Sequence, residues 1–382
     1  MPKIYTFLII LSFTFLNVNA YNDGLTDNFT RGKAAVKSIS TLTFGPEGIL
    51  FIGDSKSGSV VAIDTEDKEP NNSKKPFTLQ NVEAKIASLL GTTSDDIIIH
   101  DLAANPISQN LYLAVSRGDA SSVGSWKLPN DINYAQILLK IAPDGHIGEV
   151  SLDNISHSIA NIPSPKQEGQ RNWRKSDKRT ETITDLAYDN GKLYVAGISN
   201  EEFASSLRIL PFPFSDQSTF STIEIWHAAH GKFETEAPIR TFLPFEVNNT
   251  PQLLAAYTCT PLVSIPISAL KQGNHVKTKT LAELGAGNIP LDIIKVNASG
   301  KDKILIANTN RTLMSIDPDD LSKHTKGLTE KVNGYSAAGV PYTSIPQVGV
   351  LQIDNLNQDF VVALKRMPNG SLDIISIPSK RV

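Results

Sequence analysis

The chain has 382 residues, an almost balanced charge of 36 basic and 39 acidic side chains (net −3), and a single cysteine. The charge balance argues against a nucleic-acid-binding surface, and one cysteine excludes an internal disulfide. The length suffices for one large β domain or two ordinary domains.

The N-terminus has the order of a secretory signal peptide. Lys3 gives a positive start, an apolar run follows over residues 4–16, and Val18-Asn19-Ala20 ends in a small residue. The run is shorter than the roughly 20 apolar residues of a spanning helix, so an uncleaved anchor is the weaker alternative. We expect cleavage after Ala20, which leaves residues 21–382 as one domain with no membrane insertion. Because secreted animal proteins of this size usually contain several cysteines, we predict a bacterial protein in the periplasm or outside the cell.

A repeat unit of three apolar strands separated by turn residues recurs along the chain. The first three copies cover Ser40–Pro46, Ile49–Gly53 and Ser59–Ile63; His100–Pro106, Leu111–Ser116 and Ile137–Ile141; and Thr184–Asn190, Leu193–Gly197 and Leu207–Leu210. The weaker copies cover Arg240–Val247, Leu253–Tyr257 and Leu262–Ile265; Leu291–Asn297, Ile304–Asn308 and Leu313–Ile316; and Val348–Ile353, Phe360–Leu364 and Leu372–Ile375. Long inserts over 119–134 and 153–179 widen the spacing.

This repetition predicts an all-β fold, a β-propeller of six or seven four-stranded blades, with the N-terminal segment closing the ring. Only Val82–Leu90 and Leu321–Val332 show a helical period. A parallel βαβ fold is excluded, because it needs a crossover helix between successive strands. Two stacked sheets remain the alternative.

The stretch from Phe44 to Asp54, read as Phe-Gly-Pro-Glu-Gly-Ile-Leu-Phe-Ile-Gly-Asp, resembles blades of the NHL, SMP-30/gluconolactonase and strictosidine-synthase-like propellers. Thr184–Gly197 resembles the same pattern. The resemblance covers single blades and implies a propeller fold. The metal-binding Glu/Asn/Asp set of the gluconolactonase-like enzymes has no residue-by-residue match here, so no catalytic residue is carried over.

Three aspartates occupy one equivalent place, at the start of the first strand of three copies: Asp101, Asp185 and Asp292. In a propeller these strands line the central channel, so the carboxylates are expected to converge there. They are candidate ligand-binding residues, suited to a hard cation such as Ca²⁺. The alternative is that each accepts backbone N–H bonds from the neighbouring blade.

A second candidate set of metal ligands, suited to Cu or Zn, has imidazole and sulfur donors. It is made of His100, His227, His230 and Cys259. His227 and His230 converge only if Ala228-Ala229 turns, because strand residues three apart point to opposite faces. The alternatives are packed side chains, or a Cys–His nucleophile pair. The Gly-x-Ser-x-Gly motif of the α/β-hydrolases does not occur.

These observations predict an exported propeller that binds a small molecule or a protein partner at one face of its channel, with a metal ion (Cu, Zn or Ca) as candidate cofactor. A metal-dependent, lactonase-like hydrolase or a copper- or cofactor-assisted oxidoreductase on the same face is the enzymatic alternative. A non-catalytic interaction scaffold is the third.

Overall fold

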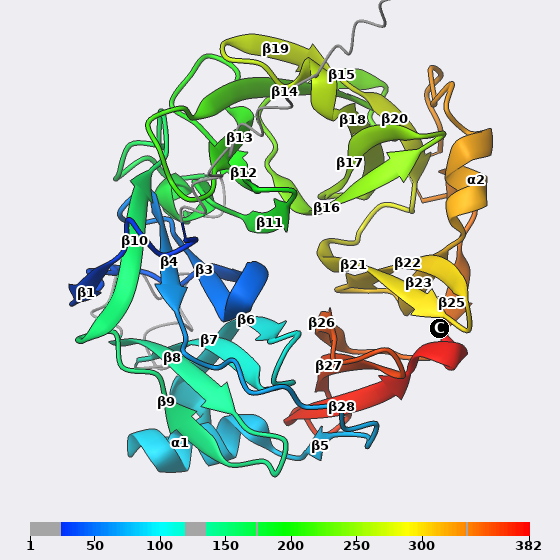
Figure 1. Cartoon of the computed structure of the whole chain (residues 1–382). Helices are drawn as coiled ribbons and strands as arrows, with labels where there is room; N and C mark the ends of the chain where they lie inside the picture. The colour runs from blue at the N-terminus through cyan, green and yellow to red at the C-terminus, as the bar shows by residue number, and fades with distance from the viewer. Residues whose placement is uncertain (1–23, 119–134, 173–174, 334) are drawn as a thin grey trace, which may run out of the picture.

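Six antiparallel sheets stand around a common axis as the blades of a propeller (Figure 1). The computed structural model describes residues 24–118, 135–172, 175–333 and 335–382. The predicted signal peptide, 1–20, and the insert 119–134 lie outside these residues. The all-β prediction is confirmed, with six blades.

The three inner strands of each blade are consecutive in the sequence. They confirm the six predicted repeat units of three strands. From blade 1 to blade 6 they are β2 (Thr41–Phe44), β3 (Ile49–Asp54) and β4 (Ser59–Asp64); β6 (Ile97–Ala104), β7 (Leu111–Arg117) and β8 (Ala135–Ile141); β11 (Asp185–Asp189), β12 (Lys192–Ile198) and β13 (Ser205–Pro211); β16 (Ile239–Val247), β17 (Thr250–Tyr257) and β18 (Pro261–Pro266); β21 (Pro290–Ala298), β22 (Lys301–Asn308) and β23 (Leu313–Ile316); β26 (Val350–Asn355), β27 (Phe360–Arg366) and β28 (Leu372–Pro378).

The outer strands come from more varied places. In the same blade order they are β10 (Ile155–Asn161) with β1 (Thr30–Gly32); β9 (Ile147–Glu149); β14 (Thr219–His227) with β15 (Lys232–Glu234) and β19 (Asn274–Lys277); β20 (Lys279–Glu283) with β24 (Ala338–Gly339); β25 (Thr343–Ile345); and β5 (Thr78–Leu79).

The blades do not follow one another around the ring in chain order. Contacts between the innermost strands give the order 2-1-3-4-5-6, so blade 1 lies between blades 2 and 3. Figure 1 shows this as blue strands between the cyan and green blades. After β4 the chain crosses blade 2, where Asp67 accepts hydrogen bonds from Asn110 and Tyr112, and reaches blade 6, where β5 pairs with β28. The first described strand, β1, instead pairs with β10 in blade 1. The prediction that the N-terminal segment closes the ring is therefore wrong, because the strand that completes the last blade is β5, from between blades 1 and 2.

The hydrophobic core is divided among the six seams of the ring. Each of six clusters of buried side chains joins two neighbouring blades, as Phe51 of blade 1 does with Tyr188 and Phe212 of blade 3. Alternation along each strand gives both faces of a blade apolar side chains. Each blade is therefore held by its neighbours on either side.

In the part of the chain that the structure describes, two α-helices flank the ring. Helix α1 (Val82–Leu90) confirms the first helical prediction. The second helix, α2 (Pro318–Lys323), begins earlier than Leu321 and ends at Lys323, well before Gly327, which has a positive φ of 74°. Among the described residues, no helix has the length and apolar character to cross a membrane.

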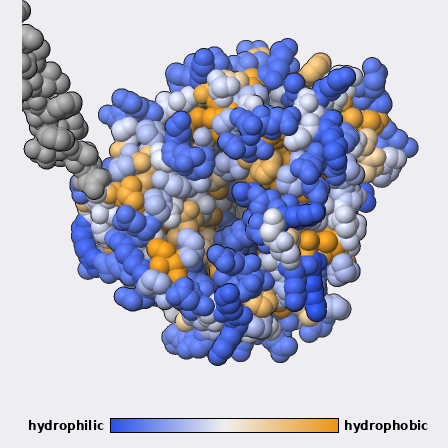
Figure 2. Space-filling view, turned by 45° about the vertical axis from the view of Figure 1, so that its right-hand side comes forward, coloured by the Kyte–Doolittle hydropathy of each residue, from blue (hydrophilic) through white to orange (hydrophobic). Residues whose placement is uncertain are grey.

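The face in Figure 2 is mainly hydrophilic, with hydrophobic residues in small separate groups. The exposed large hydrophobic side chains of the described residues are scattered over separate elements: Leu89, Ile159, Phe233, Tyr335 and Val348. Single exposed hydrophobic residues are normal on soluble surfaces and need no partner.

Candidate functional site

Aspartate carboxylates join neighbouring blades around the axis by accepting backbone N–H groups from both blades. Asp101, Asp185 and Asp292 occupy equivalent places in blades 2, 3 and 5, each opposite an alanine of the second strand. One oxygen of each accepts the N–H of the next residue in its own strand. The other accepts an N–H from the neighbouring blade; the donors are Leu42, Phe242 and Ile353, at 2.7, 2.8 and 2.7 Å.

The carboxylate of Asp354 has a similar role, although comparing equivalent places of the sequence repeats does not identify it. It accepts the N–H of Ala104 at 2.8 Å and so joins blade 6 to blade 2. It stands two residues after Gln352, which follows the bulge of blade 6 as Asp101 follows that of blade 2. A comparison of equivalent places alone could not find it.

These carboxyls are hard to ionise. Burial raises the pKa of Asp101 to about 6, of Asp185 to about 7 and of Asp354 to about 6, and raises that of Asp292 well above its usual value. The charge of Asp101 raises the pKa of Asp185 and Asp292 further, so the groups interact across the axis. Each side chain keeps some exposure toward the axis. Among the described residues, no three of these carboxylates bring oxygens within 4.8 Å of one another.

A recurrent β-bulge directs side chains to one end of the axis. In blades 2, 4, 5 and 6 the first strand gains one extra residue just before Asp101, Thr241, Asp292 and Gln352. The extra residues are His100, Arg240, Leu291 and Leu351. Since a bulge frees a residue from the ladder and re-aims its side chain, it explains how His100 and Arg240 reach a shared pocket.

That pocket, the channel-mouth pocket, lies at the end of the axis where the innermost strands begin. Its cavity of about 360 Å³ is lined by Ser38, Ile39, Ser40, Ser55, Lys56, His100, Gln136, Asn172, Ser176, Thr180, Glu181, Ile183, Thr184 and Arg240. The lining comes from blades 1, 2 and 4 and from the insert before blade 3. It is polar, and its charged side chains are Lys56, Arg240 and Glu181.

Within the pocket His100 is a neutral, hydrogen-bonded imidazole. Its Nε2 lies 2.6 Å from Ser116 Oγ, which in turn accepts from Gln136 Nε2 at 2.9 Å. A serine hydroxyl has one donor and two acceptor sites, so Ser116 can still either donate to His100 Nε2 or accept from it. Burial, assisted by the nearby charge of Lys56, lowers the pKa of His100 to about 4. His100 is therefore uncharged at neutral pH.

Lys56 is held in place by the backbone around it. Buried Asp54 accepts the N–H groups of Ser57 and Ser38, each at 3.0 Å, and the Lys56 N–H donates to Ser38 Oγ at 3.0 Å. Among the described residues the Lys56 ammonium has no ion-pair partner, whereas Arg240 lies 3.3 Å from Glu181. Lys56 and Arg240 were not singled out from the sequence, because neither belongs to a motif.

The insert that walls the pocket is fastened by two arginines. Arg179 donates to the carbonyls of Ser55 and Lys166. Arg208, fully buried on β13, donates to Pro163 and Thr182 and to two further carbonyls. The wall is therefore a fixed part of the propeller.

Cys259 lies elsewhere, in the turn between β17 and β18. Its N–H donates to the Asn288 carbonyl at 3.1 Å, at the seam between blades 4 and 5. Cys259 and Thr260 both have positive φ angles, 65° and 71°. Cys259 is not part of the donor group that His227 and His230 form with Glu234.

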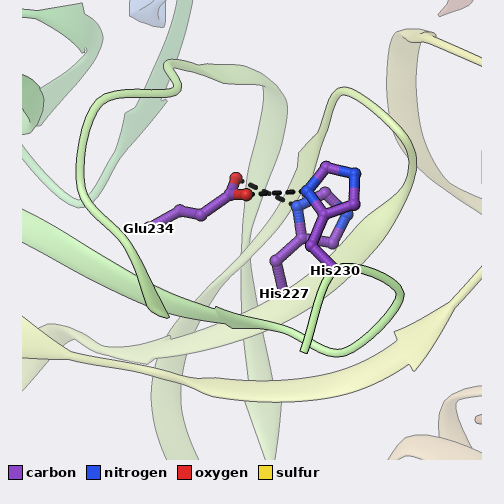
Figure 3. A group of neighbouring side chains, drawn as sticks. All are labelled: His227, His230 and Glu234. Atoms are coloured by element: carbon purple, nitrogen blue, oxygen red, sulfur yellow. Dashed lines mark hydrogen bonds and ion pairs between the residues drawn. The ribbon is translucent and has the colours of Figure 1, made fainter. Parts of the chain in front are cut away.

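His227 and His230 do come together, at the outer edge of blade 3 (Figure 3). The chain turns after His227, with Gly231 N–H donating to the His227 carbonyl at 2.8 Å, which is the turn that convergence required. The two rings stack with centroids 3.8 Å apart. Glu234 of β15 joins them: its oxygens lie 3.0 Å from His227 Nδ1 and 2.7 Å from His230 Nδ1. The four predicted soft ligands thus occupy three separate places.

Comparison with known proteins assigns no family to the chain. No protein-family model matches the chain, and no curated protein matches it. Solved structures that align with it include a glucose dehydrogenase-like protein of Thermus thermophilus (11% identity, 91% of this chain and 99% of that chain, TM-score 0.35) and YCF48 of Cyanidioschyzon merolae (10%, 93% and 99%, 0.36). An engineered glycoside hydrolase of family GH43 aligns with 13% identity over 79% of this chain and 52% of its own, with a TM-score of 0.36. Such low scores carry no argument about activity.

Proposed function

We propose that this chain is an exported propeller that binds a small polar ligand with an anionic group in the channel-mouth pocket. The observation that carries the proposal is the Lys56 ammonium, which faces the pocket beside His100 without an ion-pair partner among the described residues. A half-buried cation gains most from an anionic ligand, because water screens it poorly.

The pocket suits a ligand of modest size. Its volume of about 360 Å³ lies at the lower end of the range for small-molecule sites. The Lys56 ammonium lines the pocket beside His100 and can donate to an anionic group of the ligand, while the lining carboxylate, Glu181, is already paired with Arg240. A carboxylate or phosphate carried by a polar, hydroxyl-bearing molecule matches this distribution.

A larger hollow of about 1010 Å³ at the opposite end of the blades is a weaker candidate. It lies among the turns of blades 5 and 6, and its basic side chains Lys74, Lys380 and Arg381 are exposed. Exposed lysines bind anions weakly because water screens them. The volume alone therefore does not favour it.

The binding test uses tag-free protein without residues 1–20. Isothermal titration with sugar acids, sugar phosphates and small dicarboxylates should identify a ligand whose affinity falls at least tenfold in Lys56→Met. His100→Gln should weaken it less, since His100 is uncharged at neutral pH. Lys85→Met, at an exposed lysine on α1, is the matched control. The proposal fails if Lys56→Met binds as tightly as the parent protein, or if no compound binds.

Export is tested separately. We expect the full chain, expressed in a bacterium, to reach the periplasm or medium, and N-terminal sequencing to begin at Tyr21. Retention of residues 1–20 on a cytoplasmic product would contradict export and leave the binding test unaffected.

A further inference from the structure

The hairpin that joins β14 to β15 gathers three metal-type donors. His227, His230 and Glu234 each place a ligand atom within 4.8 Å of the others (Figure 3). Two imidazoles and one carboxylate form a ligand set typical of Zn²⁺ and of neighbouring divalent transition metals. The arrangement depends on one short turn, so it does not need distant parts of the chain to move.

Two atoms beside this group are buried without a hydrogen-bond partner among the described residues. One is His227 Nε2, in a side chain only 2% exposed. The other is Glu283 Oε2, from β20 of blade 4, whose second oxygen accepts the Ala229 N–H at 3.1 Å. An unsatisfied buried polar atom costs about 1–3 kcal/mol, and orphans of this kind are rare in folded proteins. Here a nitrogen and a carboxylate oxygen lie beside one candidate ion site.

Two carboxylates border the hairpin. Glu234 contacts both imidazoles, and Glu283 accepts the Ala229 N–H from across the blade seam. Two ionised carboxylates would balance one divalent ion.

We propose that the β14–β15 hairpin binds one divalent ion of the zinc class through His227, His230 and Glu234, with Glu283 as a second carboxylate across the blade seam. The site is separate from the channel-mouth pocket and does not depend on the function proposed for it.

Binding would tie blade 3 to blade 4. The hairpin already contacts blade 4 through Ala229 and Glu283, and the Ala228 carbonyl accepts the Val332 N–H at 3.0 Å. An ion held by the hairpin and balanced by Glu283 would add a link at the outer edge of this seam, so we assign it a structural role. The exposed fraction of His230, 45%, gives the ion a route in.

The test uses tag-free protein freed of metal with a chelator. Titration with Zn²⁺ should give one ion per chain and a higher melting temperature, and Co²⁺ should produce the visible absorption of a low-symmetry nitrogen–oxygen site. His230→Gln, at a half-exposed position where the fold should survive, should weaken Zn²⁺ at least tenfold, and Glu234→Gln should do the same. Circular dichroism confirms that the variants fold.

His146→Gln, at an exposed histidine of the β8–β9 turn, is the control and should bind as the parent does. Absence of stoichiometric Zn²⁺ binding would overturn the proposal and leave a hydrogen-bonded clamp of two histidines and a glutamate. Equal binding by the parent and His230→Gln, or equal weakening by His146→Gln, would also overturn it.

Discussion

The carboxyls around the axis should make this protein more stable in mild acid than at neutral pH. A group whose pKa is higher in the folded state binds a proton more tightly there, so its contribution is fully present below the unfolded pKa and is lost as pH rises through the folded pKa. For Asp101 and Asp354 that window runs from about 4 to about 6, and for Asp185 to about 7.

The size of the effect follows from the pKa values. A rise from 3.8 to about 6 corresponds to about 3 kcal/mol, and a rise to about 7 to about 4 kcal/mol, since a tenfold change in proton affinity is worth about 1.4 kcal/mol. His100 acts in the opposite sense: its lowered pKa, about 4, makes stability increase with pH up to about 6.5. Because the carboxyls keep some exposure toward the axis, water reduces these values. We expect a net loss of at least about 2 kcal/mol between pH 5 and pH 7.

The assay is urea unfolding of the protein without residues 1–20, followed by circular dichroism at half-unit steps from pH 5 to pH 8. Asp185→Asn removes one titrating group and should flatten the slope between pH 5 and pH 7 by up to about 1.4 kcal/mol per pH unit. Exposed Asp216→Asn should leave the slope unchanged. A free energy of unfolding that is constant or rises from pH 5 to pH 7 would refute the reasoning, as would equal slopes for Asp185→Asn and the parent.

Three further substitutions test the scaffold by urea unfolding. Arg208→Leu removes a guanidinium that donates to four backbone carbonyls, of which that of Ser164 keeps the Asn200 N–H, and should cost about 3 kcal/mol and expose the insert to proteases; unchanged proteolysis would contradict the fastening role. Asp67→Ala removes the shared acceptor of three side chains, Ser108, Asn110 and Tyr112, and should cost about 3 kcal/mol, so a loss below about 1 kcal/mol would show that the crossing segment is not held there. Gly197→Ala places a Cβ 2.0 Å from the Thr182 carbonyl and should cost more than about 3 kcal/mol; Gly148→Ala, with open space around it, is its control and should cost less than about 1 kcal/mol.

The inner part of every blade could be predicted from the sequence, and the outer edge could not. Buried strands such as β3 and β22 are long apolar runs bounded by turn residues, which is a strong local signal. The edge strands are short or come from distant segments: β5 has two residues, and β10 follows blade 2 although it belongs to blade 1. A pairing between distant segments leaves no periodic pattern of its own, so neither the edge strands nor the exchanged order of blades 1 and 2 could be foreseen.

The candidate sites divide in the same way. The aspartates could be found because equivalent places in repeats can be compared, and the convergence of His227 and His230 was conditional on one turn that the structure contains. Lys56 and Arg240 could not be found, because their placement depends on a bulge and on a turn held by Asp54. A metal site with ligands from different blades, such as His100 and Cys259, could be predicted only by assuming which end of its blade each residue lies at, and the sequence does not show this.

The exchanged order of the first two blades limits how this architecture can evolve. Propellers change size when a stretch of gene encoding one whole blade is duplicated or lost. Here blades 1 and 6 are each assembled from separated stretches, because β10 and β5 lie far along the chain from the strands they complete. A duplication that covers only β2 to β5 would copy parts of two blades and complete neither. In blades 3 to 5 the four central strands follow in chain order, and the later stretches β19 and β24 add only further edge strands to blades 3 and 4. We therefore expect relatives with another blade number to differ in this part of the chain.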